Sequence, residues 1–106
     1  MITVTYHRHE NEVVVKGHAQ SGEAGHDLVC ASASILVWTL ASFVENAKEA
    51  GQVPEPILVI EEGNFWVLCN PHRNIKPSVT LVFDSICAGF ELLARSHPDN
   101  ISYEIV

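Results

Sequence analysis

The stretch ILVIEEGNFWVLC, residues 57–69, indicates the class of fold. Two apolar runs, residues 57–60 and 65–69, flank the polar residues Glu-Glu-Gly-Asn, a composition typical of a reversal between two antiparallel strands. The stretch therefore predicts a β-hairpin, preceded by a boundary at Pro54 and Pro56.

Toward the N-terminus the chain predicts a second hairpin and a long helix. Apolar Ile2, Val4 and Tyr6 alternate with polar residues, and after a polar turn at residues 10–12 a β-branched run continues toward residue 18. Residues 19–26 have no periodicity and predict a loop. An apolar helical pattern then begins near Asp27 and ends near residue 50, where Gly51 is a stop signal.

Toward the C-terminus apolar residues recur at spacings of three and four between residues 79 and 93, which predicts a second amphipathic helix ending before Pro98. Residues 101–105 alternate as a last short strand. The expected order is ββαββαβ, an α+β fold with one largely antiparallel sheet packed with two helices. With no linker or repeat in the sequence, we expect residues 1–106 to form a single domain.

The composition narrows the possible partners and location. A chain of 106 residues, 47% hydrophobic, has enough apolar surface for one core, and its net charge of −7 disfavours nucleic acid and favours basic partners. Three cysteines without a Cys-x-x-Cys pair indicate a reducing compartment, and residues 1–10 do not read as a signal peptide, so we expect a cytoplasmic protein. Residues 28–44 lack charge, but their small and polar residues favour a buried helix over a membrane span.

Two reactive side chains, His18 and Cys30, lie twelve residues apart, at the end of a predicted strand and the start of a predicted helix. If Asp27 is the N-cap, Cys30 is at the third helical position, where the helix terminus favours the thiolate. A nearby imidazolium favours the thiolate further, and the pair then forms a nucleophile and base. The alternative is that Cys30 is a packed, inert thiol.

The motif GHAQSGEAGHDLVCASAS, residues 17–34, closely resembles that of the ribosomal-processing cysteine protease family Prp. In that family Gly-His-Ala is followed by Gly-x-Asp-(Ile/Leu)-Val-Cys-Ala and a serine. The chain length and the order of elements are also similar to the family's.

The resemblance implies a cysteine endopeptidase that removes the short N-terminal extension of ribosomal protein L twenty-seven, a basic protein of the large subunit. By position, the catalytic histidine corresponds to His18 and the nucleophile to Cys30. The resemblance also implies a homodimer and a mobile loop at residues 19–26 that orders around the peptide. Aromatic residues precede the family's cleavage point, so an apolar pocket lined by Phe or Trp is expected beside the thiol. The alternative function is a non-enzymatic, ribosome-associated binding module on the same scaffold.

Several residues near the pair are candidates for supporting roles. Asp27 either caps the helix or orients His18, and Ser34, four residues after Cys30, either supports the site or packs. Backbone amides at the helix start, including that of Cys30, are expected to stabilise the oxyanion. In the predicted loop, Ala19, Gly22, Gly25 and His26 are assigned to the flexible substrate-binding segment.

A metal site is a weaker interpretation, with His72, Cys69 and Cys87 as candidates together with His18, His26 and Cys30. Only Cys69 and His72 have the spacing of paired zinc ligands, so we expect neither metal nor cofactor, and expect Cys69 and Cys87 to be packed thiols. Four apolar residues of the first helix indicate either a dimer seam or a deep core: Trp38, Leu40, Phe43 and Val44.

Overall fold

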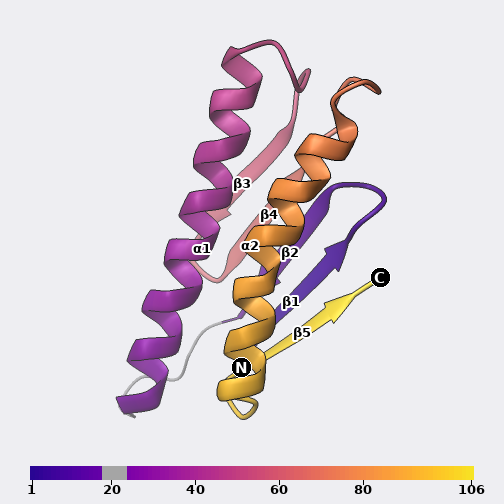
Figure 1. The fold of residues 1–106 in the computed structure, drawn as a ribbon. Helices are drawn as coiled ribbons and strands as arrows, with labels where there is room; N and C mark the ends of the chain where they lie inside the picture. The colour runs from indigo at the N-terminus through magenta and orange to yellow at the C-terminus, as the bar shows by residue number, and fades with distance from the viewer. Residues whose placement is uncertain (18–23) are drawn as a thin grey trace.

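The computed structural model describes residues 1–17 and 24–106, except for the side chains of residues 24–27. The expected element order ββαββαβ is confirmed (Figure 1). The elements are β1 (Ile2–His7), β2 (Glu12–Lys16), α1 (Ala24–Glu49), β3 (Ile57–Glu61), β4 (Asn64–Leu68), α2 (Lys76–Ser96) and β5 (Ile101–Ile105).

The strands form one sheet in the order β3-β4-β2-β1-β5. Both predicted hairpins are present: β1 pairs antiparallel with β2, and β3 with β4, where Glu61 faces Asn64 across a two-residue turn. β2 and β4 are also antiparallel, with Val15 opposite Phe65. Only β5 runs parallel to its neighbour, β1, with Ile2 opposite Ile101. The sheet is therefore largely antiparallel, as expected.

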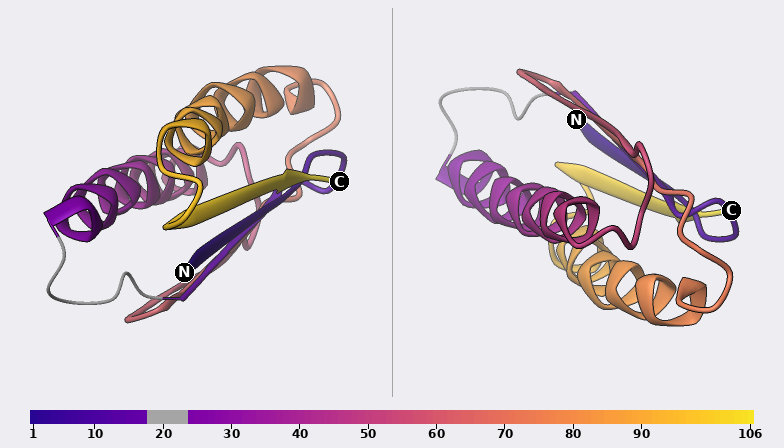
Figure 2. Two further views of the ribbon diagram at one scale, coloured as in Figure 1. Left: turned by 90° about the horizontal axis from the view of Figure 1, so that it is seen from below. Right: turned by 90° about the horizontal axis from the view of Figure 1, so that it is seen from above.

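Both helices lie on the same side of the sheet, so the molecule has two layers (Figure 2). The core lies between the layers, and the side chains of Val4, Tyr6, Val13 and Val67 contribute to it from three strands. Alternation along each strand directs these apolar residues to the helices, because successive side chains of a strand point to opposite faces. Helix α2 adds Phe83 and Phe90, neither of which is exposed.

Helix α1 begins earlier than the sequence pattern predicted. It starts at Ala24, three residues before Asp27, so Asp27 lies within the helix and the prediction that it is the N-cap is wrong. Gly25 and His26, expected in the loop, are on the helical backbone as well. The predicted stop is confirmed: Gly51 adopts φ 73° and donates its N–H to the carbonyl oxygen of Lys48 at 3.0 Å.

Of the four apolar residues of α1 that indicated either a dimer seam or a deep core, most belong to the core. Leu40 and Val44 are fully buried, and Phe43 packs edge-on against Phe83 with ring centroids 6.5 Å apart. Only Trp38, 58% exposed, is on the surface. Both helices are long and apolar enough to cross a membrane by composition, but their buried residues pack against the sheet.

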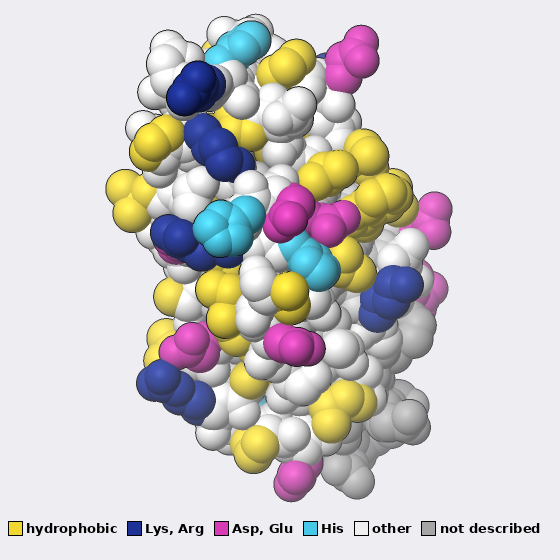
Figure 3. All heavy atoms as spheres, turned by 90° about the vertical axis from the view of Figure 1, so that its right-hand side faces the viewer, with side chains coloured by type: hydrophobic (Ala, Val, Ile, Leu, Met, Phe, Trp, Pro, Cys, Tyr) yellow, Lys and Arg dark blue, Asp and Glu magenta, His cyan; other side chains and the backbone are white. Residues whose placement is uncertain are grey.

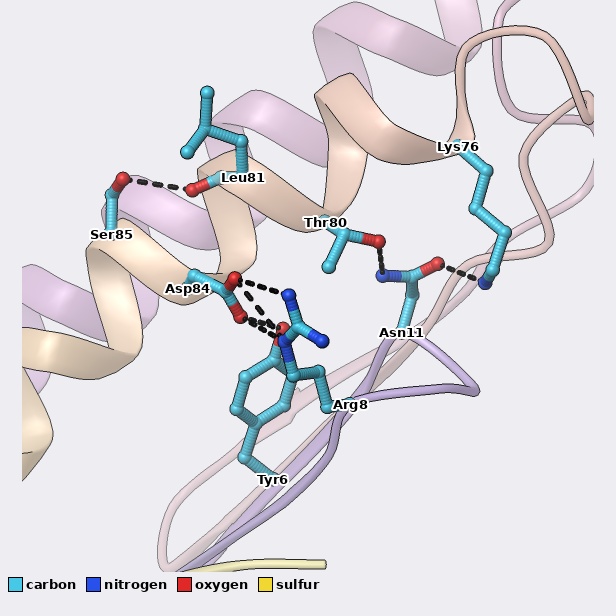
Figure 4. A network of polar contacts seen from close by, with 8 residues as sticks. All are labelled: Tyr6, Arg8, Asn11, Lys76, Thr80, Leu81, Asp84 and Ser85. Carbon is cyan, nitrogen blue, oxygen red and sulfur yellow. Dashed lines mark hydrogen bonds and ion pairs between the residues drawn. The ribbon is translucent and has the colours of Figure 1, made fainter.

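A polar network fastens α2 to the first hairpin (Figure 4). Asp84 of α2 accepts hydrogen bonds from the Tyr6 hydroxyl at 2.8 Å and from Arg8 Nε and Nη2 at 2.9 Å each. Asn11, in the turn between β1 and β2, is fully buried and donates through Nδ2 to Thr80 Oγ1 at 3.0 Å. Because buried polar groups are costly without partners, these contacts determine how α2 lies on the hairpin.

Candidate active site

Cys30 lies on the second turn of α1 and is half-buried, at the edge of a cavity of about 530 Å³. We call this space the Cys30 cavity. It is lined by Ile2, Val15, Gly17, Cys30, Ala33, Ser34, Val37, Trp38, Ile60, Glu61, Glu62, Gly63, Asn64 and Phe65. The thiol is therefore not sealed in the core, and a peptide-sized space lies beside it.

Helix α1 supplies one wall of the cavity with residues four apart in sequence, Cys30, Ser34 and Trp38. Residues at this spacing lie above one another on one helix face. Ser34 therefore lies on the same helix face as Cys30, as expected. The role of Ser34 in the reaction stays a prediction. Trp38 lies one turn further along and presents an exposed indole to the cavity.

The sheet supplies the opposite wall. Ile2, Val15 and Phe65 are buried and come from three neighbouring strands, β1, β2 and β4. The expected apolar pocket beside the thiol is therefore present, and the aromatic residues that line it are Trp38 and Phe65.

The β3–β4 turn contributes Glu61, Glu62, Gly63 and Asn64 to the lining of the Cys30 cavity, and we call these four residues the rim. Glu61 and Glu62 are exposed. The side chains of the two glutamates form no hydrogen bond or ion pair with the described part of the chain. No sequence signal indicated these rim residues, because their position depends on the pairing of β4 with β2 rather than on local pattern.

Gly17 connects this rim to the motif. Its N–H donates to the carbonyl oxygen of Gly63 at 3.0 Å, and its φ of 101° is one that side-chain-bearing residues rarely adopt. A Cβ at this position would overlap the carbonyl oxygen of Met1, so only glycine fits. Gly17, which lines the Cys30 cavity, is followed in sequence by His18.

His18, Ala19 and Gly22 lie outside the described residues, so the distance between the imidazole and the Cys30 thiol stays a prediction. The side chains of Gly25, His26 and Asp27 have no described positions either, and orientation of His18 by Asp27 also stays a prediction.

The early start of α1 corrects one part of the expected chemistry. Cys30 is the seventh helical residue rather than the third, so its backbone N–H is beyond the four that a helix leaves unpaired at its N-terminus. The influence of the terminus on a charge also decreases within the first turn. The expected oxyanion donor is therefore not the Cys30 amide in this conformation.

The other two cysteines are packed thiols, as predicted. Cys69 and Cys87 are buried, and burial raises the pKa of Cys69 to about 11 and that of Cys87 to about 12. Both thiols are thus protonated at neutral pH, and neither suits a nucleophile's role. Among the described residues, no three His, Cys, Asp or Glu side chains form a group able to hold a metal ion.

Comparison with known proteins extends the resemblance beyond the motif. The family described as cysteine protease Prp matches residues 1–102. No curated protein matches the chain.

Three solved structures have the same fold. The essential ribosomal processing protease Prp from S. aureus, in complex with a covalently linked product peptide, is 25% identical with a TM-score of 0.73, and the match covers 100% of both chains. Its complex with a substrate peptide has the same TM-score and coverage at 23% identity. SMU.848 from Streptococcus mutans is 27% identical, with a TM-score of 0.61 over 99% of this chain and 91% of that one.

The match over nearly the whole sequence and the agreement in fold lead to one assignment: the chain belongs to the cysteine protease Prp family and is a cysteine protease.

Proposed function

We propose that this protease removes the N-terminal extension of a large-subunit ribosomal protein, L twenty-seven, in the cytoplasm. The observation that carries the proposal is the opening of Cys30 into a cavity with Trp38 and Phe65 in its walls. These side chains suit the aromatic residues that precede the family's cleavage point. The S. aureus protein of the same family is described as a ribosomal processing protease in complex with a substrate peptide.

The charge of the cavity rim supports a basic substrate. Glu61 and Glu62 add two negative charges beside the apolar walls, on a chain whose net charge is already −7. Carboxylates at the mouth of a cleft raise the local concentration of cationic ligands and speed their association. A lysine-rich ribosomal protein is a substrate that this negative electrostatic potential would attract.

The proposed reaction uses the two motif side chains in sequence. The Cys30 thiolate attacks the carbonyl carbon before the scissile bond, and the imidazolium of His18 donates its proton to the departing amine, which leaves an acyl-enzyme. A water molecule that gives its proton to His18 then attacks the thioester and releases the acid. Amide donors at the first turn of α1 are candidates for the oxyanion site.

We propose a homodimer as the active form. Leu28 and Ile35 of α1 are 59% and 63% exposed. Large apolar side chains exposed along one helix are a common feature of association surfaces. Light scattering of the purified chain tests this, and a monomer at all accessible concentrations would contradict it.

The alternative, a non-enzymatic binding module that uses the same scaffold, predicts a buried, unreactive Cys30. The family assignment and the half-buried thiol at a cavity favour the protease.

A peptide assay tests the proposed function. A fluorogenic peptide that copies the extension junction is expected to be cleaved by the wild-type chain and not by the Cys30→Ala or His18→Ala variants. Cys69→Ser and Cys87→Ser serve as matched controls and retain cleavage. Turnover by Cys30→Ala at the wild-type rate would exclude Cys30 as nucleophile, and cleavage of unrelated peptides at equal rates would exclude the proposed substrate.

A further inference from the structure

A second hollow, of about 440 Å³, lies between the start of α2 and the turn that joins β1 to β2. We call it the basic hollow. Among the described residues, its lining shares none with that of the Cys30 cavity and consists of Arg8, His9, Arg73, Lys76, Pro77, Thr80, Leu81 and Asp84. Figure 3 views the side of the molecule that carries this turn; Lys and Arg side chains lie along the upper left of this face, with His, Asp and Glu side chains near its centre.

The basic hollow concentrates positive charge on an acidic chain. The sequence has six Lys and Arg residues, and three of them line this one hollow, while Asp84 is the one acidic residue among its described lining residues. Counted as in the chain's −7, that is without histidine, the described lining residues carry a net charge of +2. Because like charges repel, such a gathering is unfavourable for the free protein and favourable for an anionic ligand.

The polar network described above holds two of these cations in place. Lys76 Nζ donates to Asn11 Oδ1 and to the carbonyl oxygen of His9, each at 2.8 Å, and the buried Asn11 is itself fastened to Thr80 (Figure 4). An ammonium has three donors, so one N–H of Lys76 is left for a ligand. Arg8 is held by Asp84 through Nε and Nη2, which leaves its Nη1.

Arg73 is the uncommitted cation of the basic hollow. Its side chain is exposed and makes no hydrogen bond or ion pair with any residue that the structure describes. A guanidinium presents its donors in a planar fork that matches the oxygens of a phosphate.

Part of the wall is apolar. Pro77 and Leu81 line the same hollow, and Leu81 is 66% exposed, which is the largest exposed fraction among the large hydrophobic side chains of the described residues. The volume is within the range of small-molecule sites and exceeds what a single phosphate ion fills.

We propose that the basic hollow binds a phosphorylated small molecule of about the size of a nucleoside monophosphate. Arg73, Lys76 and the free Nη1 of Arg8 hold the phosphate, and Pro77 with Leu81 contacts the apolar ring. A long polyanion fits poorly, because the rest of the chain is strongly acidic and repels it.

Titration of the ¹⁵N-labelled full chain tests the site, with adenosine monophosphate as probe and adenosine as its uncharged counterpart. The nucleotide is expected to shift the amide signals of Thr80 and Leu81, and adenosine to bind at least about tenfold more weakly, because it lacks the charge-assisted hydrogen bonds. A short oligonucleotide is expected to bind no tighter than the monophosphate. Equal affinity for adenosine and its monophosphate, tighter binding of the oligonucleotide, or shifts spread over the whole surface would overturn the proposal.

Substitution of arginine residues gives a second test of the site. Arg73→Ala is expected to lower the affinity for adenosine monophosphate about tenfold. Arg73→Lys is expected to lower it less, since lysine keeps the positive charge but lacks the planar donors of a guanidinium. Arg95→Ala is the matched control, because Arg95 is also exposed on this chain but pairs with Glu91 at the other end of α2. Peptide cleavage by Arg73→Ala is expected to equal that of wild type. Equal affinities of the Arg73→Ala and Arg95→Ala variants would show that the hollow is not the site.

Discussion

The backbone N–H of Gly17 donates to the carbonyl oxygen of Gly63 at 3.0 Å, and this contact joins the end of β2 to the β3–β4 turn. The strand that leads to His18 is thereby attached to the turn that carries Glu62. Both glycines line the Cys30 cavity, so one edge of the candidate active site depends on a contact between residues 46 positions apart in sequence.

Substitution of Gly17 is expected to damage both stability and activity. In Gly17→Ala the new methyl group meets the carbonyl oxygen of Met1, and the positive φ adds backbone strain, so the free energy of unfolding falls by about 2 kcal/mol or more. Urea denaturation measures this loss, and the peptide assay measures the loss of cleavage. Gly51→Ala is the control: φ is also positive, but an added Cβ meets no atom of the described residues within 4 Å beyond its immediate neighbours, so we expect a loss of about 1 kcal/mol and full cleavage. Equal stability of the two variants would contradict the argument from Met1.

Trp38 is expected to contribute to substrate binding rather than to folding. Because its side chain is 58% exposed, Trp38→Ala should change the free energy of unfolding by less than about 1 kcal/mol. Loss of an aromatic wall in the Cys30 cavity should raise KM about fivefold or more for peptides with aromatic residues before the cut, with a smaller effect on kcat. Leu92→Ala, 61% exposed on α2, is the control. If the KM of Trp38→Ala equals that of the wild type, the indole does not contribute to substrate specificity.

Glu61 and Glu62 are expected to select basic side chains in the substrate. The double variant Glu61→Gln with Glu62→Gln should lower kcat/KM about fivefold for a lysine-bearing peptide at low salt, and should leave a neutral peptide unaffected. The difference should shrink as salt is added, because exposed charges are screened. Glu45→Gln, an exposed carboxylate of α1 outside the cavity, is the matched control. If both peptides lose activity equally, the carboxylates have a structural role instead.

The three thiols are expected to differ sharply in reactivity. Cys30 borders a cavity, whereas burial raises the pKa of Cys69 to about 11 and that of Cys87 to about 12. A disulfide reagent at neutral pH should therefore modify Cys30 in the native chain and the other two only after unfolding, since the thiolate is the attacking form. Mass spectrometry of the modified peptides identifies the sites. Rapid labelling of Cys87 in the folded chain would show that α2 opens more readily than its packing indicates.

The ion pair between Arg8 and Asp84 predicts a loss of stability in acid. Hydrogen bonds from Arg8 lower the pKa of the Asp84 carboxyl below its ordinary value of 3.8. The pair therefore stabilises the fold above the pKa of the unfolded chain, and this contribution is lost as pH falls through the lower pKa of the folded state. Asp84→Asn should be less stable than wild type at pH 7, and the difference between their melting temperatures should shrink below about pH 4. A difference that is constant with pH would contradict the assignment. Asp99→Asn, at an exposed turn position, is the control.

Much of the fold was predictable because its signals are local. The alternation of Ile2, Val4 and Tyr6 and the three- and four-residue spacing in α2 each reflect the geometry of a single strand or helix. The same holds for the wall formed by Cys30, Ser34 and Trp38, since residues four apart in a helix share a face. The pattern predicts a start of α1 at Asp27, because aspartate is a favoured capping residue, but the helix begins three residues earlier, at Ala24.

Local patterns along the chain suffice to predict the order of the strands and helices, and residues 17–34 suffice for the family resemblance. That Ile2, Phe65 and the β3–β4 turn line one cavity with Cys30, and that Arg8, Arg73 and Lys76 line another, follows from long-range packing alone. Strand pairing and helix packing join segments far apart in the chain, such as Val15 with Phe65, and which segments pair depends on burying the whole core at once.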